Sequence, residues 1–249
     1  TSERVRAEMM VHAPDGVEPG KAIWVGLQLV HQPKWHSYWK NSGDSGLPTQ
    51  LQWTLPAGVM AGDIAWPVPS KIPFGTLTNY GYGDTVLLPV PLTITPDFKP
   101  SLLTGDLEVK LKAQWLVCYN VCIPEEGEFT LNVPLKSSTA VNSQAFDAIL
   151  AAQPKMLQGE SEVTPRATSL DVRVSGLPES LRGKTLEFFP ETGEVIDNSA
   201  KLNQAWEGAT WTASVPISPQ RSQGPLVMPI VLTYGGQGWR TEARVGAEW

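Results

Sequence analysis

The stretch Ile23–His31 reads IWVGLQLVH, and its apolar side chains recur at every second position. Successive side chains of a β-strand point to opposite faces of a sheet, so Val25, Leu27 and Leu29 share one face. Such alternation is typical of a strand that packs one face on a core and exposes the other to water. This stretch therefore predicts a strand in a sheet with one packed and one solvated side.

Further strands are indicated on both sides of this stretch by the same period in Phe129, Leu131 and Val133 and by short apolar runs between turn residues. In the first half of the chain, strands are expected at Val5–Val11, Ile23–His31, Leu51–Leu55, Val86–Ile94, Leu107–Val117 and Glu128–Leu135. In the second half, they are expected near Ser169–Ser175, Thr185–Pro190, Thr210–Ile217, Leu226–Tyr234 and Trp239–Val245.

A short helix is predicted between the two sets of strands, because Phe146, Ile149 and Leu150 fall at helical spacing before Pro154 stops the run. The chain has 249 residues, and a typical domain has about 100 to 200, so two domains are expected. We predict an all-β protein of two β-sandwich domains joined by a short helical linker. The expected boundaries are 1–136 for the first domain, 137–160 for the linker and 161–249 for the smaller second domain.

Composition excludes several classes of function. Hydrophobic residues make up 41% and charged residues 18%, which is ordinary for a globular protein. The net charge of −6 and the lack of a basic cluster argue against nucleic acid as a partner.

No window approaches 18 consecutive apolar residues, so no membrane insertion is expected. The polar start at Thr1–Arg6 is compatible with a mature portion of a longer exported protein. The sequence lacks GxSxG, glycine-lysine phosphate loops and HExxH, so neither hydrolysis nor a cofactor is expected.

The two cysteines, Cys118 and Cys122, lie four residues apart in the segment WLVCYNVCIPEE. In an extended strand their Cα atoms would be about 13 Å apart, whereas a disulfide needs about 5.5 Å. A disulfide between them therefore requires a turn, which we expect at Tyr119–Asn120.

A disulfide in such a short loop can be a structural staple or a redox-active bond. Closing a five-residue loop stabilises a protein by only about 2 kcal/mol, which a domain with a full core does not need. A tight turn also holds sulfur atoms near the surface, where a partner thiolate can attack them. The neighbours are Glu125 and Glu126 rather than the cations that activate a thiol, which favours a relay over a strong oxidant.

Several segments resemble the N-terminal periplasmic region of the DsbD and ScsB family of membrane thiol:disulfide reductases, and its ScsB members in particular. The cysteine segment Trp115–Glu126 is the most specific of them. The others are Trp35–Pro48 (WHSYWKNSGDSGLP), Asn79–Asp84 (NYGYGD), Val86–Val90 (VLLPV), Phe188–Glu191 (FFPE) and Val195–Asp197 (VID).

The resemblance implies immunoglobulin-like domains in the periplasm, as part of an inner-membrane protein that needs no cofactor for this step. Electrons would arrive from a thioredoxin-like domain of the same membrane reductase and leave to a soluble thioredoxin-like protein of the ScsC type. In the family the second cysteine forms the mixed disulfide, which assigns that role to Cys122 and the resolving role to Cys118.

The resemblance also implies residues around the redox centre. Relatives have a cap loop that shields the disulfide, and the matching positions here are Asn79, Tyr80, Gly81 and Tyr82. This loop lacks a phenylalanine, and only three residues separate the cysteines, where DsbD has more. His36 and Tyr38 alternate at an expected strand end and match positions near the redox centre; the alternative is that each is a half-exposed packing residue.

Two other functions stay open. Ten tryptophans, among them Trp35, Trp39, Trp53 and Trp66, could form a stacking surface for sugars or peptides in a non-catalytic binding module with a structural disulfide. The cysteine pair could instead bind Cu(I), because soft thiolates select that ion. His12, His31 and His36 would then be candidate ligands, but their spacing matches no metal-binding pattern, so no metal site is assigned.

Overall fold

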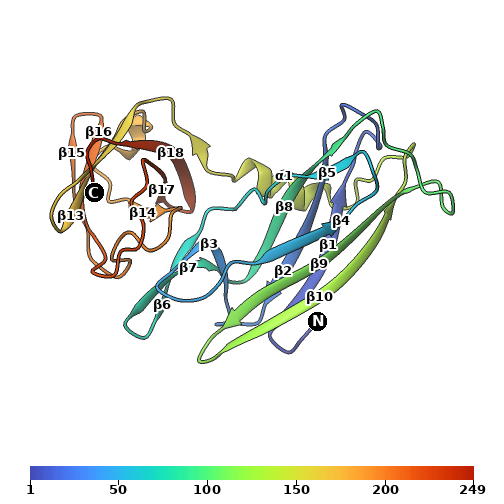
Figure 1. The fold of residues 1–249 in the computed structure, drawn as a ribbon, viewed down its shortest axis with the longest axis horizontal. Helices are drawn as coiled ribbons and strands as arrows, with labels where there is room; N and C mark the ends of the chain where they lie inside the picture. The colour runs from blue at the N-terminus through green and yellow to red at the C-terminus, as the bar shows by residue number, and fades with distance from the viewer. The chain divides into compact units, whose positions relative to one another are not determined.

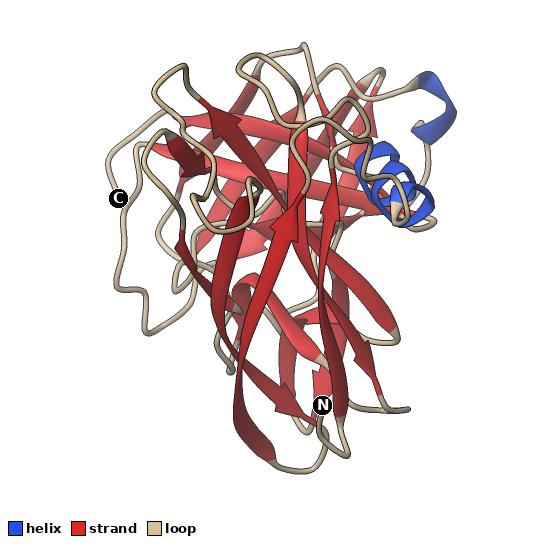
Figure 2. Ribbon diagram, turned by 90° about the vertical axis from the view of Figure 1, so that its right-hand side faces the viewer, coloured by secondary structure: helices blue, strands red, loops and turns tan.

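The computed structural model describes residues 1–249, and strands form nearly all of its regular structure (Figures 1 and 2). The chain divides into two compact units. Unit 1 contains Thr1–Trp39, Leu47–Pro67 and Tyr82–Gln153, and unit 2 contains Lys40–Gly46, Val68–Gly81 and Pro154–Trp249. No helix in either unit is both long and apolar enough to cross a bilayer.

Unit 1 contains two antiparallel sheets. The four-stranded sheet has the order β1 (Val5–His12), β2 (Ile23–His31), β8 (Thr85–Ile94) and β5 (Val59–Ala61). The three-stranded sheet has the order β10 (Cys122–Val133), β9 (Leu107–Cys118) and β4 (Gln50–Thr54). Val25, Leu27 and Leu29 of β2 are completely buried, which confirms the predicted alternation.

The long hairpin of β9 and β10 carries the cysteines at its tip (Figure 1). In β9 the odd-numbered residues are buried and most even-numbered ones are exposed. Phe129, Leu131 and Val133 of β10 stand opposite the buried Leu111, Val109 and Leu107. Burying an aliphatic side chain stabilises a fold by about 1.5 to 3 kcal/mol, so this alternation fixes the register of the hairpin. The even-numbered residues, Cys118 and Cys122 among them, then belong to the outer face.

The helix expected in the linker is α1 (Ser143–Ala151), and it groups with unit 1. Its fully buried Phe146 packs against Met10 of β1 and Leu87 of β8. These two residues lie on the face of the sheet opposite Val25, because Met10 pairs with Gly26 and Leu87 with Gln28. The helix therefore covers part of the outer face of the four-stranded sheet.

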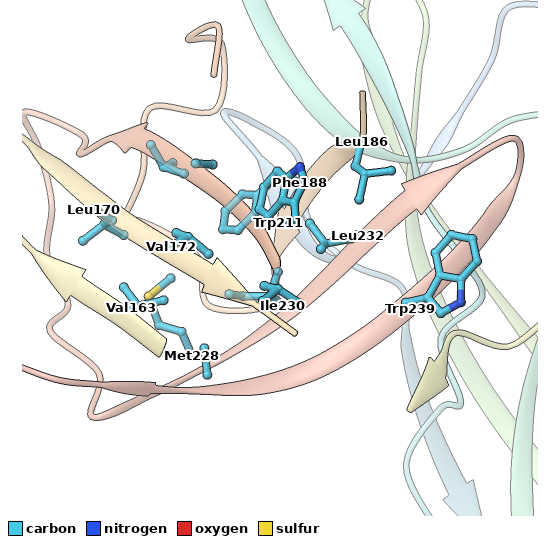
Figure 3. Packing of buried hydrophobic residues seen from close by; sticks show 14 of the residues in the cluster. Val163, Leu170, Val172, Leu186, Phe188, Trp211, Met228, Ile230, Leu232 and Trp239 are labelled. Carbon is cyan, nitrogen blue, oxygen red and sulfur yellow. The ribbon is translucent and has the colours of Figure 1, made fainter. Parts of the chain in front are cut away.

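Unit 2 is built around an eight-stranded sheet. Its order is β14 (Glu187–Pro190), β17 (Val227–Tyr234), β18 (Gln237–Val245), β12 (Ser161–Pro165), β13 (Ser169–Val174), β16 (Thr210–Pro216) and β15 (Asn203–Glu207), with β11 (Lys155–Met156) paired to β18. A 3₁₀ turn, η1, spans Glu179–Leu181. The strands surround an apolar core in which Phe188 stacks on Trp211 beside Val172, Ile230 and Leu232 (Figure 3).

A fourth, small sheet has the order β3 (Ser37–Gly43), β7 (Leu77–Tyr82) and β6 (Ser70–Phe74). The boundary between the units falls within β3 and within β7, so residues 40–46 and 68–81 group with unit 2 rather than with the rest of 1–136. Gly43 has a φ of 84°, and a Cβ there would lie 2.5 Å from the Thr78 carbonyl oxygen. Only glycine therefore allows this close approach of β3 to β7.

Candidate functional site

The two cysteines are joined by a disulfide across the end of the β9–β10 hairpin. Cys118 is the last residue of β9 and Cys122 the first of β10, and they stand directly opposite each other with Cα atoms 4.2 Å apart. The chain turns through Tyr119–Val121, as the cysteine spacing requires.

Backbone hydrogen bonds explain why the cysteines approach so closely. The Cys118 N–H donates to the His36 carbonyl (3.0 Å), and the His36 N–H donates to the Cys118 carbonyl (2.9 Å). Both backbone groups of Cys118 thus point away from β10, which makes Cys118 and Cys122 a non-hydrogen-bonded pair. In antiparallel sheets the Cα atoms of such pairs are only about 4.5 Å apart, with their side chains close together. The register of the hairpin therefore places the two sulfur atoms within bonding distance.

The two cysteines differ in exposure. Cys118 is completely buried (0% exposed), whereas Cys122 is partly exposed. The expectation that the turn holds both sulfurs near the surface is therefore wrong for Cys118, because the paired strand segment at His36 flanks it on the side away from Cys122. A thiolate must reach the sulfur that it attacks. Cys122 is the accessible end of the bond.

Two predicted site residues lie at the disulfide. The Tyr38 hydroxyl is 3.9 Å from Cys122 Sγ and, since the bonded sulfur carries no proton, it is the donor of this contact. Burial raises the pKa of Tyr38 to about 12, so the phenol stays protonated at neutral pH. The His36 ring lies edge-on to Tyr38 at 5.3 Å, and burial together with nearby His31 lowers the pKa of His36. Tyr38 and His36 are therefore uncharged near pH 7.

Aromatic contacts hold the hairpin tip. The Tyr119 ring packs edge-on against Trp35 at 5.9 Å, and Lys34 Nζ lies 5.7 Å from the centre of the Tyr119 ring. Tyr119 and Val121 are nevertheless 37% and 53% exposed. The turn that joins the cysteines is thus held on one side and presents apolar surface on the other.

Glu125 is a buried structural anion, which the sequence did not reveal. Its carboxylate accepts hydrogen bonds from Ser2 Oγ (3.0 Å), Arg4 Nη1 (3.0 Å) and Trp115 Nε1 (3.1 Å), and its side chain is only 10% exposed. Unlike the exposed Glu126, Glu125 is thus already paired within the fold. The only sequence signal was its position in the strand, on the same face as the buried Trp115.

Comparison with known families identifies the part of the chain that contains the β9–β10 hairpin. The family profile described as "Thiol:disulfide interchange protein DsbD, N-terminal" matches residues 7–134, just over half of the chain, including both cysteines. The chain belongs to the DsbD N-terminal family. With its Cys118–Cys122 disulfide, it contains a thiol:disulfide exchange domain.

Among solved structures, the crystal structure of the N-terminal periplasmic domain of ScsB from Proteus mirabilis is similar to the chain. The TM-score is 0.73 at 16% sequence identity, and the match covers 98% of this chain and 94% of that chain. Identity at this level shows a shared fold, and it confirms the predicted all-β, immunoglobulin-like fold of this DsbD-family chain. No curated protein sequence matches.

The positions that match the DsbD cap loop lie in strand β7, not in a loop, because this segment pairs with β6. In unit 2, Ser45 donates to Asn79 Oδ1 (2.9 Å), and the Tyr80 hydroxyl donates to Asn198 Oδ1 (2.7 Å). Gly81 also belongs to unit 2, whereas Tyr82 belongs to unit 1, where its hydroxyl donates to the Pro67 carbonyl (2.8 Å). The structure thus brings His36 and Tyr38 to the disulfide, and shielding by the cap positions stays a prediction.

The structure bears on both alternative functions. None of the ten tryptophans is highly exposed: Trp39 is buried, and Trp35, Trp53 and Trp66 are half-buried. These residues pack rather than form an open stacking surface. His31 lies near His36, but its ring bonds Ser37 Oγ (2.9 Å) and the Asp84 carbonyl (2.8 Å), and no group of three or more His, Cys, Asp or Glu side chains could hold a metal.

Proposed function

We propose that this chain relays electrons by thiol:disulfide exchange, with Cys122 forming the mixed disulfide and Cys118 acting as the resolving thiol. The supporting observation is the difference in exposure between a buried Cys118 and a partly exposed Cys122. Of two bonded sulfurs, the one that a partner reaches first is the one it attacks, and the other becomes the leaving group.

Reduction of the domain proceeds in two steps. A donor thiolate attacks Cys122 Sγ, a donor–Cys122 bond forms, the Cys118–Cys122 bond breaks, and Cys118 leaves as a thiolate that takes up a proton from water. The donor's second thiolate then attacks the donor sulfur of the mixed disulfide and releases Cys122. The donor is oxidised to its disulfide, and the domain gains two electrons.

Transfer to the acceptor reverses these roles. The Cys122 thiolate attacks the acceptor disulfide, and one acceptor sulfur leaves as a thiolate. Cys118 then attacks Cys122 Sγ, the domain disulfide reforms, and the second acceptor thiolate is released. The backbone bonds to His36 hold Cys118 beside Cys122, which keeps the resolving sulfur within reach throughout.

Tyr38 supports both directions as a positioning residue and hydrogen-bond donor. Its protonated hydroxyl faces Cys122 Sγ, where negative charge develops during exchange. A hydrogen bond to the charged form of a thiol favours the thiolate and lowers the pKa of the thiol.

The similarity to DsbD and ScsB supports thioredoxin-like partners in general, and we propose the following ones. The donor is a thioredoxin-like domain of a membrane reductase, the acceptor is a soluble thioredoxin-like protein of the ScsC type, and the site of action is the periplasm. Unit 2 would serve as a spacer or as an additional docking surface.

Single-cysteine variants test the assignment. Cys118→Ser, incubated with an oxidised ScsC-type protein, should accumulate a stable mixed disulfide through Cys122, visible on a non-reducing gel and located by mass spectrometry. Cys122→Ser should form none, because its remaining thiol is buried. Trapping through Cys118 alone would reverse the roles, and no trapping by either variant would remove the exchange function.

A further inference from the structure

A groove of about 480 Å³ lies beside the disulfide on the outer face of the β10–β9–β4 sheet. The lining residues that matter here are Leu47, Pro48, Gln114, Leu116, Pro124 and Glu126, all of unit 1. None of them takes part in the exchange chemistry.

The groove is continuous with the redox site. Leu116 stands opposite Pro124 in the β9–β10 ladder, as Cys118 stands opposite Cys122. Residues two apart in a strand share a face and are separated by about 6.6 Å. Leu116 and Pro124 are therefore the next pair after the cysteines on the same face, and a protein bonded to Cys122 Sγ covers them.

The groove combines apolar walls with one acidic edge. Leu47 is 63% exposed, and Leu116 and Pro124 supply further apolar surface. Glu126 is exposed, whereas the carboxylate of the adjacent Glu125 is already bound by Arg4. Gln50, Gln114 and Glu126 stand in one cross-strand row, which adds side-chain amides next to the acid.

We propose that this groove is the docking site for a segment of the redox partner next to its reactive cysteine. The segment carries an apolar side chain, which enters between Leu47 and Leu116, and a lysine or arginine, which faces Glu126. The inference rests on the proposed exchange function and adds the chemistry by which the partner is recognised.

Two substitutions in the full chain test the groove, each with a matched control. Leu47→Asp and Glu126→Lys alter it; Leu103→Asp alters an equally apolar but distant exposed loop residue, and Glu128→Lys makes the same charge change one pair further along β10. The measurement is the rate constant at which the reduced chain, with free Cys118 and Cys122 thiols, reduces an oxidised ScsC-type protein at low salt. The rate at which dithiothreitol reduces the Cys118–Cys122 disulfide is measured for comparison.

Both groove variants should react with the ScsC-type protein about tenfold more slowly. Leu47→Asp removes the apolar wall that receives the partner's side chain, and Glu126→Lys replaces the complementary charge, which mainly slows association. The controls should stay within about twofold of the wild type, and dithiothreitol should reduce all the proteins at one rate because it needs no docking. Unchanged dithiothreitol rates also show that the variants fold normally.

The outcomes separate the two proposals. If the wild type exchanges and the groove variants match it, docking in the groove is wrong while the exchange function stands. If Glu126→Lys accelerates exchange, the segment is not basic and the stated occupant is wrong. If the wild type reacts with dithiothreitol but not with the ScsC-type protein, both proposals fail.

Discussion

Cys118 and His36 exchange two backbone hydrogen bonds, of 3.0 and 2.9 Å, directly beside the disulfide. Cys118 is thus held between two neighbours, His36 through its backbone and Cys122 through its sulfur. This arrangement buries one sulfur and leaves the other accessible. The different roles proposed for the two cysteines in exchange therefore follow from the backbone pairing of Cys118 with His36.

The hydroxyl of Tyr38 should control the reactivity of Cys122. Tyr38→Phe removes a hydrogen bond worth about 1 kcal/mol, so the pKa of the Cys122 thiol should rise by somewhat less than about one unit. At pH 7 the reduced variant should react with iodoacetamide about three- to fivefold more slowly than the wild type, because less thiolate is present. The pH dependence of the alkylation rate of reduced Cys118→Ser, with and without Tyr38→Phe, measures the effect.

Tyr82→Phe is the matched control, because its hydroxyl donates to the Pro67 carbonyl and not to a sulfur. It should leave the alkylation profile of Cys122 unchanged. An identical profile for Tyr38→Phe would show that the 3.9 Å contact has no influence on the thiol.

Glu125 should contribute to the stability of unit 1. Glu125→Gln replaces an acceptor of three hydrogen bonds by an amide that cannot accept them all, and should lower the free energy of unfolding by about 1 to 3 kcal/mol. The exposed Glu128→Gln, on the same strand, should change it by less than about 0.5 kcal/mol. Urea denaturation followed by tryptophan fluorescence measures both, and equal effects would rule out a structural role for the Glu125 carboxylate.

Strands with one buried face could be predicted from the sequence. The structure places β2 at Ile23–His31, as predicted, and β9 at Leu107–Cys118, one residue longer than predicted. In both, the alternation of apolar residues directly reflects packing on a core. The β-sandwich class followed from the number and spacing of such strands, whereas its immunoglobulin-like form was implied by the resemblance to the DsbD family.

Strands without this alternation were missed. Ser70–Phe74 (SKIPF) and Leu77–Tyr82 (LTNYGY) contain proline, glycine and asparagine, which are rare in strands, and they form through pairing with each other. Polar contacts between residues far apart in the sequence could not be predicted either. Glu125 pairs with Arg4, which is 121 positions away in the sequence. No periodic pattern in the sequence predicts such a pair.

Acid should destabilise the protein in part through the buried His31. Burial lowers the pKa of His31 in the folded state despite its hydrogen bond to the Asp84 carbonyl. The unfolded chain takes up a proton at His31 below about pH 6.5, whereas the folded state resists it, so the free energy of unfolding falls as the pH drops below that value. Urea denaturation at about pH 7.5 and about pH 5.5 should show this loss, and His31→Gln should flatten it. An unchanged slope in the variant would mean that other groups cause the acid sensitivity.

In unit 2, Arg240 should stabilise the fold through Glu191. The Glu191 carboxylate, 7% exposed, bonds Arg240 Nε (2.6 Å) and Lys40 Nζ (2.7 Å). Burial alone would raise the pKa of Glu191, but the hydrogen bonds from Arg240 and Lys40 outweigh it and lower the pKa. Because Arg240→Met leaves this buried carboxylate with Lys40 alone, it should cost about 2 to 4 kcal/mol of unfolding free energy.

Arg173→Met is the control for Arg240→Met, because the pair of Arg173 with Glu207 is exposed on both sides. Removing such a surface pair should cost less than about 1 kcal/mol. Thermal or urea unfolding of the two variants compares them, and a smaller loss for Arg240→Met than for Arg173→Met would contradict the importance of the buried anion.

The reduction potential of Cys118–Cys122, measured together with its exchange with a thioredoxin-like protein, decides whether this disulfide is redox-active or structural. An exchange domain should have a potential between about −270 and about −120 mV, the range of known exchange proteins, and should equilibrate rapidly with the thioredoxin-like protein. A potential below about −300 mV, with no exchange, is the property of a structural disulfide and would contradict the account.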